Sequence, residues 1–411
     1  MADKISNQDR FQKIIKIEQE LGNIQDVDVL LERILTEART IVNADAGSIY
    51  VVEGNKIRIK YGQNETRRKL LEPGQKLPYI NFDFEINEKT ICGYVASTGI
   101  TLNIKDAYEI PEDKPYKFGK STDQITNYRT TSIYTLPLKM ARGKFLGRLQ
   151  IINKMDENGN VTFFNEEDEL LISHFASSAV QALQHANLTS AMVRRTLKMA
   201  EFRDPKETYL HVERVSSYAI ELYDRWAFNH KIPQEELHRY RDALKIAAKF
   251  HDVGKVGISD IILKKAARFT DEERNIMKTH TYIGAQLFDA KESFLDAMSQ
   301  EIALHHHDWW NGDEKGYPGD INLDDFSILE GTMPEFKPLA GEKIPLSARI
   351  VAVADVFDAL CSNRCYKEAW TIEDSVKEIK NGSGTQFDPE IVETFLQVKD
   401  RICAIQEALK D

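Results

Sequence analysis

Hydrophobic and polar residues alternate with a period of two in the N-terminal part of the chain, which is typical of half-buried strands. The segment SIYVVEGNKIRIKY, residues 48–61, alternates on both sides of Gly54-Asn55, a dipeptide that favours a two-residue hairpin turn. A second strand pair is expected over residues 132–154, and helical patterns such as DVDVLLERILTEARTIV flank the strands. The pattern predicts an α+β domain with an antiparallel sheet over residues 25–165, preceded by a helix within residues 1–24.

Residues 166–203 contain neither proline nor glycine, and small or apolar residues recur there at alternating spacings of four and three. This spacing is the heptad pattern of a coiled coil. The seam consists of Ile172, Ala176, Ala179, Leu183, Ala186, Ser190, Val193, Leu197 and Ala200. We expect a linker helix that pairs with a second copy of the chain in a homodimer. A long helix packed on its own domain is the alternative.

Strand signals almost vanish after residue 204, and helical stripes follow one another to the C-terminus. The pattern predicts an all-α domain over residues 204–411, interrupted by an acidic, loop-like segment at 320–338. Eight of the ten histidines of the chain lie in this region. Their positions on the predicted helices therefore decide what chemistry the region supports.

Five of the predicted C-terminal helices carry a histidine or carboxylate on an otherwise apolar stripe. These residues are Glu207, His211, His251, His280, His306 and Asp355, and Asp252 directly follows His251. The alternative for a single histidine is a bond to a backbone carbonyl in the core. For groups on five helices this is less fitting, because burying charged groups costs free energy unless they share a partner. A polynuclear metal site satisfies all of them. Imidazole and carboxylate without thiolate suit iron, manganese, nickel or zinc.

Two of these helices have predicted ends. The helix that carries His280 is expected to begin with a capping box at Thr270 and Glu273 and to continue through Leu287. Gly254 suits the end of the helix that carries His251.

A metal cluster of this kind has a clear chemical use, because it lowers the pKa of a bound water from about 15.7 to about 7. Two metals also neutralise a phosphoryl group during in-line attack. In His251-Asp252 the carboxylate is placed to bridge two metals while the imidazole binds one. Lys255 is a candidate to contact the phosphate or to protonate the leaving oxygen, and a solvated lysine at a helix end is the alternative.

The segments HDVGKVGISD, HHDWWNG…GYP and ARIVAVADVFDAL occur in an order that resembles the HD-GYP family, a branch of the HD metal-dependent phosphohydrolases. The resemblance covers residues 204–411. It implies an all-α fold with a binuclear or trinuclear, typically iron-containing, centre. It also implies hydrolysis of the bacterial second messenger cyclic di-GMP to the linear dinucleotide and, in many members, on to GMP.

The resemblance assigns roles to individual residues. The positions that match the family's metal ligands are His211, His251, Asp252, His280, His306, His307 and Asp355, and Glu207 matches the extra carboxylate of trinuclear members. Asp252 would be the bridging carboxylate and Lys255 the lysine beside the phosphate, which makes these two the catalytic candidates. Tyr317, Arg364 and Lys367 match the substrate-binding side. The implied cofactors are two or three divalent ions, iron first, with manganese or nickel as alternatives.

The chain departs from the family pattern on the expected substrate side. The usual HHE is His306-His307-Asp308, three residues (313–315) separate NG from GYP, and Cys365 replaces a proline. No ligand is lost, so the metal chemistry is expected to persist while the nucleotide preference stays open. A mixed cyclic GMP-AMP dinucleotide is the alternative substrate. A catalytically weak cyclic dinucleotide receptor and a di-iron oxygenase are further alternatives, and the GYP segment argues against the oxygenase.

The N-terminal half resembles a GAF domain, a small-molecule sensing fold. Its Asn153-Lys154, followed by Phe164, Asp168 and Glu169, matches the NK…F-x-x-x-DE pattern of cyclic-nucleotide-binding GAF domains. In that family the motif supports the pocket without touching the ligand. A small molecule or cyclic nucleotide is therefore an expected effector. The alternative is that these acidic residues only favour the N-terminus of the helix that follows.

Composition narrows the setting. The chain has 411 residues and a net charge of -11, which argues against a DNA-binding protein because such proteins need a broad basic surface. The N-terminus is polar and has no signal-peptide pattern, and no apolar run is long enough to insert in a membrane. Four cysteines are too few for a disulfide framework, so a cytoplasmic location is expected.

Overall fold

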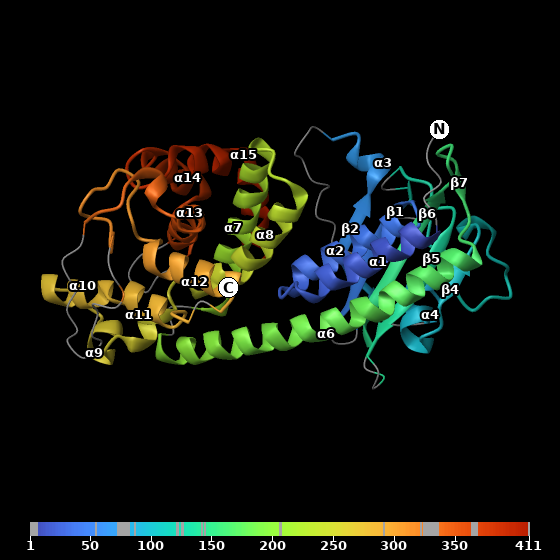
Figure 1. The fold of residues 1–411 in the computed structure, drawn as a ribbon, viewed down its shortest axis with the longest axis horizontal. Coiled ribbons are helices and arrows are strands. Elements are labelled where there is room, and N and C mark those ends of the chain that lie inside the picture. Colours follow the sequence, from blue (N-terminus) through green and yellow to red (C-terminus); the bar gives the residue numbers. More distant parts are fainter. Residues whose placement is uncertain are drawn as a thin grey trace. The chain divides into compact units, whose positions relative to one another are not determined.

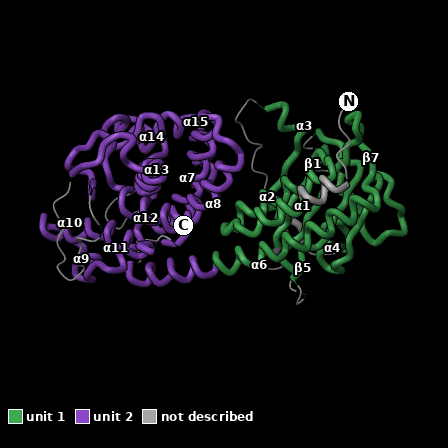
Figure 2. The backbone as a smooth tube through the Cα atoms, in the orientation of Figure 1, with its two compact units in different colours: residues 1–190 green, residues 191–411 purple. Residues whose placement is uncertain are grey.

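The computed structural model describes most of the chain. The described residues are 7–53, 56–71, 83–85, 88–120, 123–124, 127–140, 143, 145–204, 208–290, 292–320, 323, 337–362 and 369–409. The chain divides into two compact units, unit 1 (residues 1–190) and unit 2 (residues 191–411), which Figure 2 colours green and purple. The boundary falls within one helix, α6 (Glu166–Arg203).

Unit 1 is built on one antiparallel sheet. Its strands are β1 (Ala44–Glu53), β2 (Lys56–Asn64), β3 (Asp83–Glu85), β4 (Leu102–Ile104), β5 (Ile133–Lys139), β6 (Phe145–Met155) and β7 (Val161–Thr162). The strand order is β3-β2-β1-β6-β5-β4, and β7 pairs with β6. Every pair is antiparallel, which confirms the predicted α+β architecture.

Both predicted hairpins are present. The register of β1 and β2 ends at the pair Glu53–Lys56, which leaves two residues for the turn. Those two residues, Gly54 and Asn55, lie outside the described residues. The second hairpin joins β5 to β6 and closes at the pair Lys139–Phe145. The alternation of apolar and polar residues therefore predicted the strand pairing correctly.

Helices cover the two faces of this sheet. On one face lie α1 (Asn7–Gly22), α2 (Val27–Ile41) and the first part of α6, as Figure 1 shows, and they form an apolar core with Ile49, Leu149 and Ile151. Asp26 caps α2 by accepting hydrogen bonds from the N–H groups of Asp28 and Val29. The other face carries α4 (Ile91–Thr98), and a short helix, α3 (Glu65–Arg68), follows β2.

The predicted seam of α6 is covered by the chain itself. Ile172, Ala176, Ala179, Leu183 and Ala186 belong to the apolar core of unit 1. Leu197 packs with Val212, Ile246 and Phe250 in unit 2. These six side chains are therefore not available to a second chain, which corrects the assignment of this seam to a dimer interface. The homodimer itself stays a prediction.

We expect the replacement Leu183→Ala to lower the free energy of unfolding of unit 1 by about 2–5 kcal/mol, because it leaves a cavity in the core. Leu183 is only 3% exposed. The matched control is Leu188→Ala on the same helix, since Leu188 is 57% exposed and should change stability by no more than about 0.5 kcal/mol. Urea unfolding followed by circular dichroism measures both. Equal losses in the two variants would contradict the buried position of Leu183.

In its described residues unit 2 is helical and has no named strand, as predicted. Its α-helices beyond α6 are α7 (Tyr209–Asn229), α8 (Gln234–Ala247), α9 (Asp260–Leu263), α10 (Asp271–Lys278), α11 (His280–Gln286), α12 (Phe294–His305), α13 (Leu346–Cys361), α14 (Ile372–Asn381) and α15 (Pro389–Ala408). Helix α7 is central and contacts α8, α13 and α15. Their shared core includes Tyr218, Leu244, Phe357 and Phe395. Two 3-10 turns, η2 (Ala248–Phe250) and η3 (Val253–Gly257), follow α8.

The helix predicted around His280 is two helices. The capping box at Thr270 and Glu273 is present and begins α10, but α10 ends at Lys278 and α11 begins at His280. Thr279 breaks the helix: its hydroxyl donates to the carbonyl oxygen of Ile276 at 2.7 Å, and its N–H bonds the same carbonyl. The prediction of a single helix was therefore wrong, and His280 stands at a helix start.

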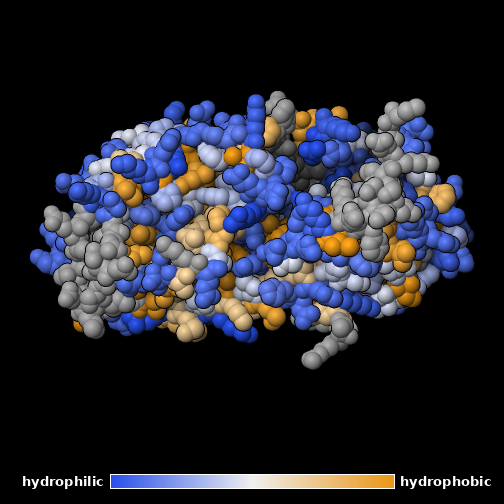
Figure 3. All heavy atoms as spheres, in the orientation of Figure 1, coloured by the Kyte–Doolittle hydropathy of each residue, from blue (hydrophilic) through white to orange (hydrophobic). Residues whose placement is uncertain are grey.

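Among the described residues, no helix combines the length and apolar character that a bilayer crossing requires. The face of the molecule drawn in Figure 3 is mainly hydrophilic, with apolar side chains scattered over it in small groups.

Candidate metal centre

Two groups of side chains in unit 2 are close enough for each to hold a metal ion. One group contains Asp252, His280, His306 and His307, and the other contains His211, His251 and Asp355. Within each group the candidate ligand atoms lie within 4.8 Å of one another. The structure thus brings together seven of the eight expected ligands. The eighth, Glu207, lies outside the described residues.

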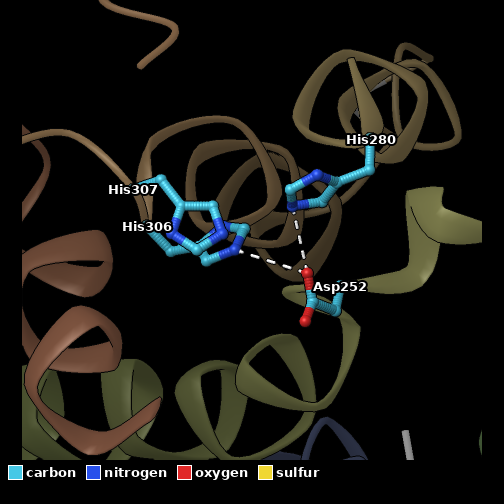
Figure 4. Close-up of side chains that lie close together, drawn as sticks. All are labelled: Asp252, His280, His306 and His307. Carbon is cyan, nitrogen blue, oxygen red and sulfur yellow. Dashed lines mark ion pairs between the residues drawn. The ribbon is translucent and has the colours of Figure 1, made fainter. Parts of the chain in front are cut away.

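Asp252 lies between the two groups. Its Oδ1 atom is 3.0 Å from Nε2 of His280 and 3.6 Å from Nε2 of His306, and Figure 4 shows both rings turned toward it. Its Oδ2 atom faces the other group, 3.5 Å from Nε2 of His251. The second group closes around Asp355, whose Oδ1 lies 3.8 Å from Nε2 of His251. A carboxylate with one oxygen toward each group has the placement that a bridging ligand needs.

Backbone carbonyls fix the orientation of three histidine rings. Nδ1 of His251 lies 2.9 Å from the Ala248 carbonyl oxygen, Nδ1 of His280 lies 2.8 Å from that of Met277, and Nδ1 of His306 lies 2.9 Å from that of Ile302. A carbonyl only accepts, so the proton resides on Nδ1 and the lone pair of Nε2 points into the site. A core histidine ordinarily bonds a backbone carbonyl, and here Nδ1 alone makes that bond. Nε2 is therefore left to bind a metal.

Several polar atoms at the centre have no hydrogen-bond partner in the part of the chain that the structure describes. Nε2 of His280, Nε2 of His306 and Oδ1 of Asp252 are buried and make no hydrogen bond with the described residues. Although His280 Nε2 and Asp252 Oδ1 are 3.0 Å apart, both atoms are acceptors when the proton is on Nδ1, so no hydrogen bond forms between them. Leaving such atoms unsatisfied costs free energy, and a divalent cation satisfies all three. The residues present fit a metal.

The protonation states also suit metal ligands. Burial, together with the neighbouring rings of His306 and His280, holds the pKa of His307 well below its ordinary value, so its imidazole is neutral at neutral pH. Burial alone would raise the pKa of Asp252, but Lys255 and His251 outweigh it and hold that pKa well below its ordinary value. Neutral imidazole and ionised carboxylate are the forms that bind metals.

A buried carboxylate that the sequence analysis missed orients His211. Nδ1 of His211 lies 2.8 Å from Oδ2 of Asp358. Arg214 donates to both Asp358 oxygens, from Nε at 2.6 Å and from Nη2 at 3.0 Å, and the Tyr218 hydroxyl adds a bond at 3.2 Å. Burial would raise the pKa of Asp358, but His211 and Arg214 lower it below its ordinary value. Asp358 is three residues after Asp355 on α13, so both face His211.

Gly254 permits the close approach of two ligand-bearing segments. A Cβ atom at this position would lie 1.9 Å from the carbonyl oxygen of His280 and 2.3 Å from the N atom of Gly284. Gly254 lies inside η3 and not at the end of α8, which ends at Ala247, so the sequence-based role for it was wrong. Its missing side chain lets η3 contact the start of α11.

The replacement Gly254→Ala should push His280 away from Asp252. We expect metal affinity to fall about 10–100-fold, the range seen when the support of a ligand is lost. Isothermal titration with manganese measures the affinity. The control is Gly62→Ala, where the nearest atom to a new Cβ is 3.8 Å away. Unchanged affinity in the Gly254 variant would show that this contact does not set the ligand spacing.

The expected substrate-side residues are partly described. The Lys255 ammonium forms an ion pair with Oδ2 of Asp252. The Tyr317 ring lies 4.8 Å from the His307 ring, and Lys278 Nζ lies 5.1 Å from the centre of the Tyr317 ring. These residues place two cations and an aromatic ring beside the first ligand group. Arg364 and Lys367 lie outside the described residues.

His305 and Asp308 form a separate pair. His305 belongs to neither ligand group, and its Nδ1 lies 2.7 Å from Oδ2 of Asp308. Oδ1 of Asp308 accepts a hydrogen bond of 2.8 Å from the N–H of Gly319. Asp308 therefore connects the end of α12 to the loop that carries Tyr317, which accounts for a carboxylate at this position.

The motif Asn153, Lys154, Phe164, Asp168 and Glu169 connects elements of unit 1. Asn153 accepts from the N–H of Thr131 at 2.7 Å and donates to the carbonyl oxygen of Arg129 at 2.8 Å. Lys154 on β6 forms an ion pair with Asp168 on α6, and Glu169 accepts from Asn103 on β4 at 2.7 Å. Phe164 is buried in the core. The contacts give the motif a supporting role in the fold.

Family models match both parts of the chain. The model described as GAF domain matches residues 26–183, and the model described as HD domain matches residues 208–360. A second model, also described as HD domain, matches residues 330–391. These matches confirm the two resemblances seen in the sequence and their order along the chain.

Characterised relatives match as well. A cyclic di-GMP phosphodiesterase of Vibrio cholerae is 36% identical over 275 residues, which are 64% of this chain and 50% of the relative. A cyclic di-GMP phosphodiesterase of Thermotoga maritima is 35% identical over 213 residues, 52% of this chain and 50% of the relative. A 3'3'-cGAMP-specific phosphodiesterase 2 of Vibrio cholerae is 30% identical over 342 residues, 79% of this chain and 57% of the relative. The chain thus spans about half the length of these relatives.

Proposed function

Because this chain contains a GAF domain followed by an HD domain, we propose that it is a metal-dependent phosphodiesterase that hydrolyses cyclic di-GMP. The product is the linear dinucleotide pGpG, with GMP as the product of a second hydrolysis. The observation that carries the proposal is Asp252, whose two oxygens face two separate groups of ligand atoms. The names of the relatives supply the substrate class.

The proposed reaction adds water across one phosphodiester bond. A bond forms between the water oxygen and phosphorus, the bond from phosphorus to the 3' oxygen breaks, and a proton is delivered to that 3' oxygen. Bound divalent cations supply Lewis acidity, which acidifies water and neutralises phosphoryl charge. The chain's own contribution is to fix the imidazoles through their Nδ1 bonds and to keep Asp252 ionised.

Lys255 is the candidate for handling charge and protons. Its ammonium is held by Asp252 at the edge of the ligand groups, and its side chain retains 23% exposure. From that position it can contact a phosphoryl oxygen or donate a proton to the departing 3' oxygen. The replacement Lys255→Met distinguishes the role of Lys255 in hydrolysis from metal binding. The metal content of this variant should be unchanged, and its rate of hydrolysis should fall.

The identity of the cations is part of the proposal. The candidate set is five imidazoles and two carboxylates with no thiolate, which suits iron, manganese and nickel and accommodates zinc. Iron is the first expectation, and a third ion would depend on Glu207. The direct test is to load the purified chain anaerobically with each of Fe(II), Mn(II) and Ni(II) and to follow cyclic di-GMP by chromatography. Absence of turnover with all three would reject cyclic di-GMP as the substrate.

A mixed cyclic GMP-AMP dinucleotide is the second candidate substrate. Two observations favour it: a relative with that specificity matches 79% of the chain, and Asp308 anchors the loop that carries Tyr317 in place of the family's glutamate. The ratio of kcat/KM for the two dinucleotides decides between them. Tight binding of either without turnover in any metal state would instead favour the receptor interpretation.

Regulation by the GAF domain completes the proposal. The family match suggests a small-molecule ligand in unit 1, and α6 runs without a break from unit 1 into unit 2. We propose that ligand binding in unit 1 changes the rate of hydrolysis in unit 2. The homodimer and the cytoplasmic location stay predictions. Turnover measured with and without ligand tests the coupling.

A further inference from the structure

Unit 1 contains a buried arginine that has few of the partners a buried charge needs among the described residues. The Arg148 side chain lies on β6, the strand between β1 and β5, and it is 0% exposed. Its Nε and Nη1 atoms have no hydrogen-bond partner, and among the described residues no carboxylate forms an ion pair with it. A charge buried without a counter-ion is costly, so this position calls for an explanation.

The contacts that Arg148 does make are weak ones. Nη2 donates to the Cys92 sulfur on α4 at 2.8 Å, and a thiol is a poor acceptor. The guanidinium lies over the Tyr50 ring at 3.8 Å, an attraction of modest size. Arg33, by contrast, lies 3.0 Å from Glu20 and 2.9 Å from Glu37. Arg148 is thus held in a fixed place, without a carboxylate partner among the described residues.

Two further polar side chains on the same face of the sheet are also unsatisfied. Gln150, two residues along β6, has a buried Oε1 atom without a partner, and so has Oγ1 of Thr135 on β5. Thr135 and Gln150 are directly paired across the two strands. Strand alternation places Arg148, Gln150 and Thr135 on one face, because Leu149 and Ile151 between them belong to the core on the opposite face. Three unsatisfied polar groups therefore gather beside α4.

We propose that this face of unit 1 binds an oxyanion, the carboxylate or phosphoryl group of a small metabolite, with Arg148 as its charged ligand. A guanidinium donates strong, charge-assisted hydrogen bonds to such a group. The two unpartnered nitrogens, Nε and Nη1, supply the donors, and the Thr135 hydroxyl supplies a third. The Tyr50 ring fixes the guanidinium plane. The ligand class is then an anion. This rests on the small-molecule ligand proposed above for unit 1 and is independent of the proposed phosphodiesterase activity of unit 2.

The test compares thermal unfolding of the full chain in sodium acetate, sodium phosphate and sodium chloride at equal ionic strength. All four tryptophans lie in unit 2, so tryptophan fluorescence reports the unfolding of unit 2. A transition that is seen by calorimetry but not by fluorescence therefore belongs to unit 1. An anion at a concentration of ten times its dissociation constant should raise the transition temperature of unit 1 by roughly 3–6 °C. Acetate acting more strongly identifies a carboxylate ligand, and phosphate acting more strongly identifies a phosphoryl ligand.

Two variants make the result specific. Arg148→Met keeps the volume but removes the charge, and it should abolish the anion-dependent rise without lowering the transition temperature in chloride. The matched control is Arg129→Met, because Arg129 also lies over a tyrosine ring but is exposed and lies 3.6 Å from Asp106. In the Arg129→Met variant the anions should still raise the transition temperature of unit 1 by the full amount. The proposal is overturned if neither anion shifts unit 1 of the unaltered chain, or if Arg148→Met responds to anions as the unaltered chain does.

Discussion

Replacing Asp252 by asparagine should lower the rate of cyclic dinucleotide hydrolysis by about a thousandfold or more. Asp252 is the residue that faces both ligand groups, with Oδ1 toward His280 and His306 and Oδ2 toward His251. An amide has the same shape but no charge, so it cannot hold two cations together. Loss of one preorganised charge-stabilising group costs about 10²–10³ in kcat, and loss of a cation adds to that.

The metal content should fall in parallel with the rate. Purified Asp252→Asn, loaded as the unaltered chain is, should retain fewer than two cations per chain by elemental analysis. Asp289→Asn is the matched control, because Asp289 is an exposed aspartate of the same unit. It should change neither the rate nor the metal content. If the Asp252→Asn variant keeps both cations and its full rate of hydrolysis, Asp252 does not bridge two cations.

Replacing Asp358 by alanine should weaken both the fold and the metal centre. Arg214 would lose both carboxylate bonds and remain a buried charge, which costs about 3–5 kcal/mol of unfolding free energy. His211 would lose the bond that orients its ring, which costs about 10–100-fold in metal affinity. Because the folded pKa of Asp358 is lowered, its contribution to stability is present above its ordinary pKa and is lost as the pH falls through the folded value.

Two further variants separate positioning from stability. Asp388 is also buried and bound to an arginine, Arg349, at 2.6 Å, but it touches no histidine of the centre. Asp388→Ala should lower stability while leaving metal affinity unchanged. Asp358→Asn keeps an oxygen for the Nδ1–H of His211, so it should restore most of the metal affinity but little of the stability. If Asp388→Ala weakens metal binding as much as Asp358→Ala, the role of Asp358 is structural only.

Local periodicity was enough to find most of the candidate centre. His211, His280 and His306 interrupt apolar stripes, and a buried stripe fixes which way each side chain points. His307 does not continue a stripe and was assigned only through the family resemblance. Asp358 was missed because its partner Arg214 is 144 residues away, and a pairing over that distance leaves no mark on the local pattern.

The errors have similar physical causes. The break at Thr279 involves neither proline nor glycine, since a threonine side chain competes with the helical hydrogen bonds. The heptad spacing of α6 correctly predicted an apolar face that is buried. The spacing does not show whether the helices that cover this face belong to the same chain or to another one. On β6, Arg148 and Gln150 alternate with apolar residues, which is a pattern typical of a sheet with one solvent-facing side. The structure instead buries that side beside α4.

We propose that Asp252 joins two cation sites into one hydrolytic centre. The most direct measurement is anaerobic elemental analysis and product identification on one sample, as iron or manganese is added stepwise to metal-free protein. We expect hydrolysis of cyclic di-GMP or its mixed analogue to a linear dinucleotide to appear as occupancy approaches about two cations per chain. Full turnover at one cation per chain, or two bound cations with no turnover of either dinucleotide, would contradict it.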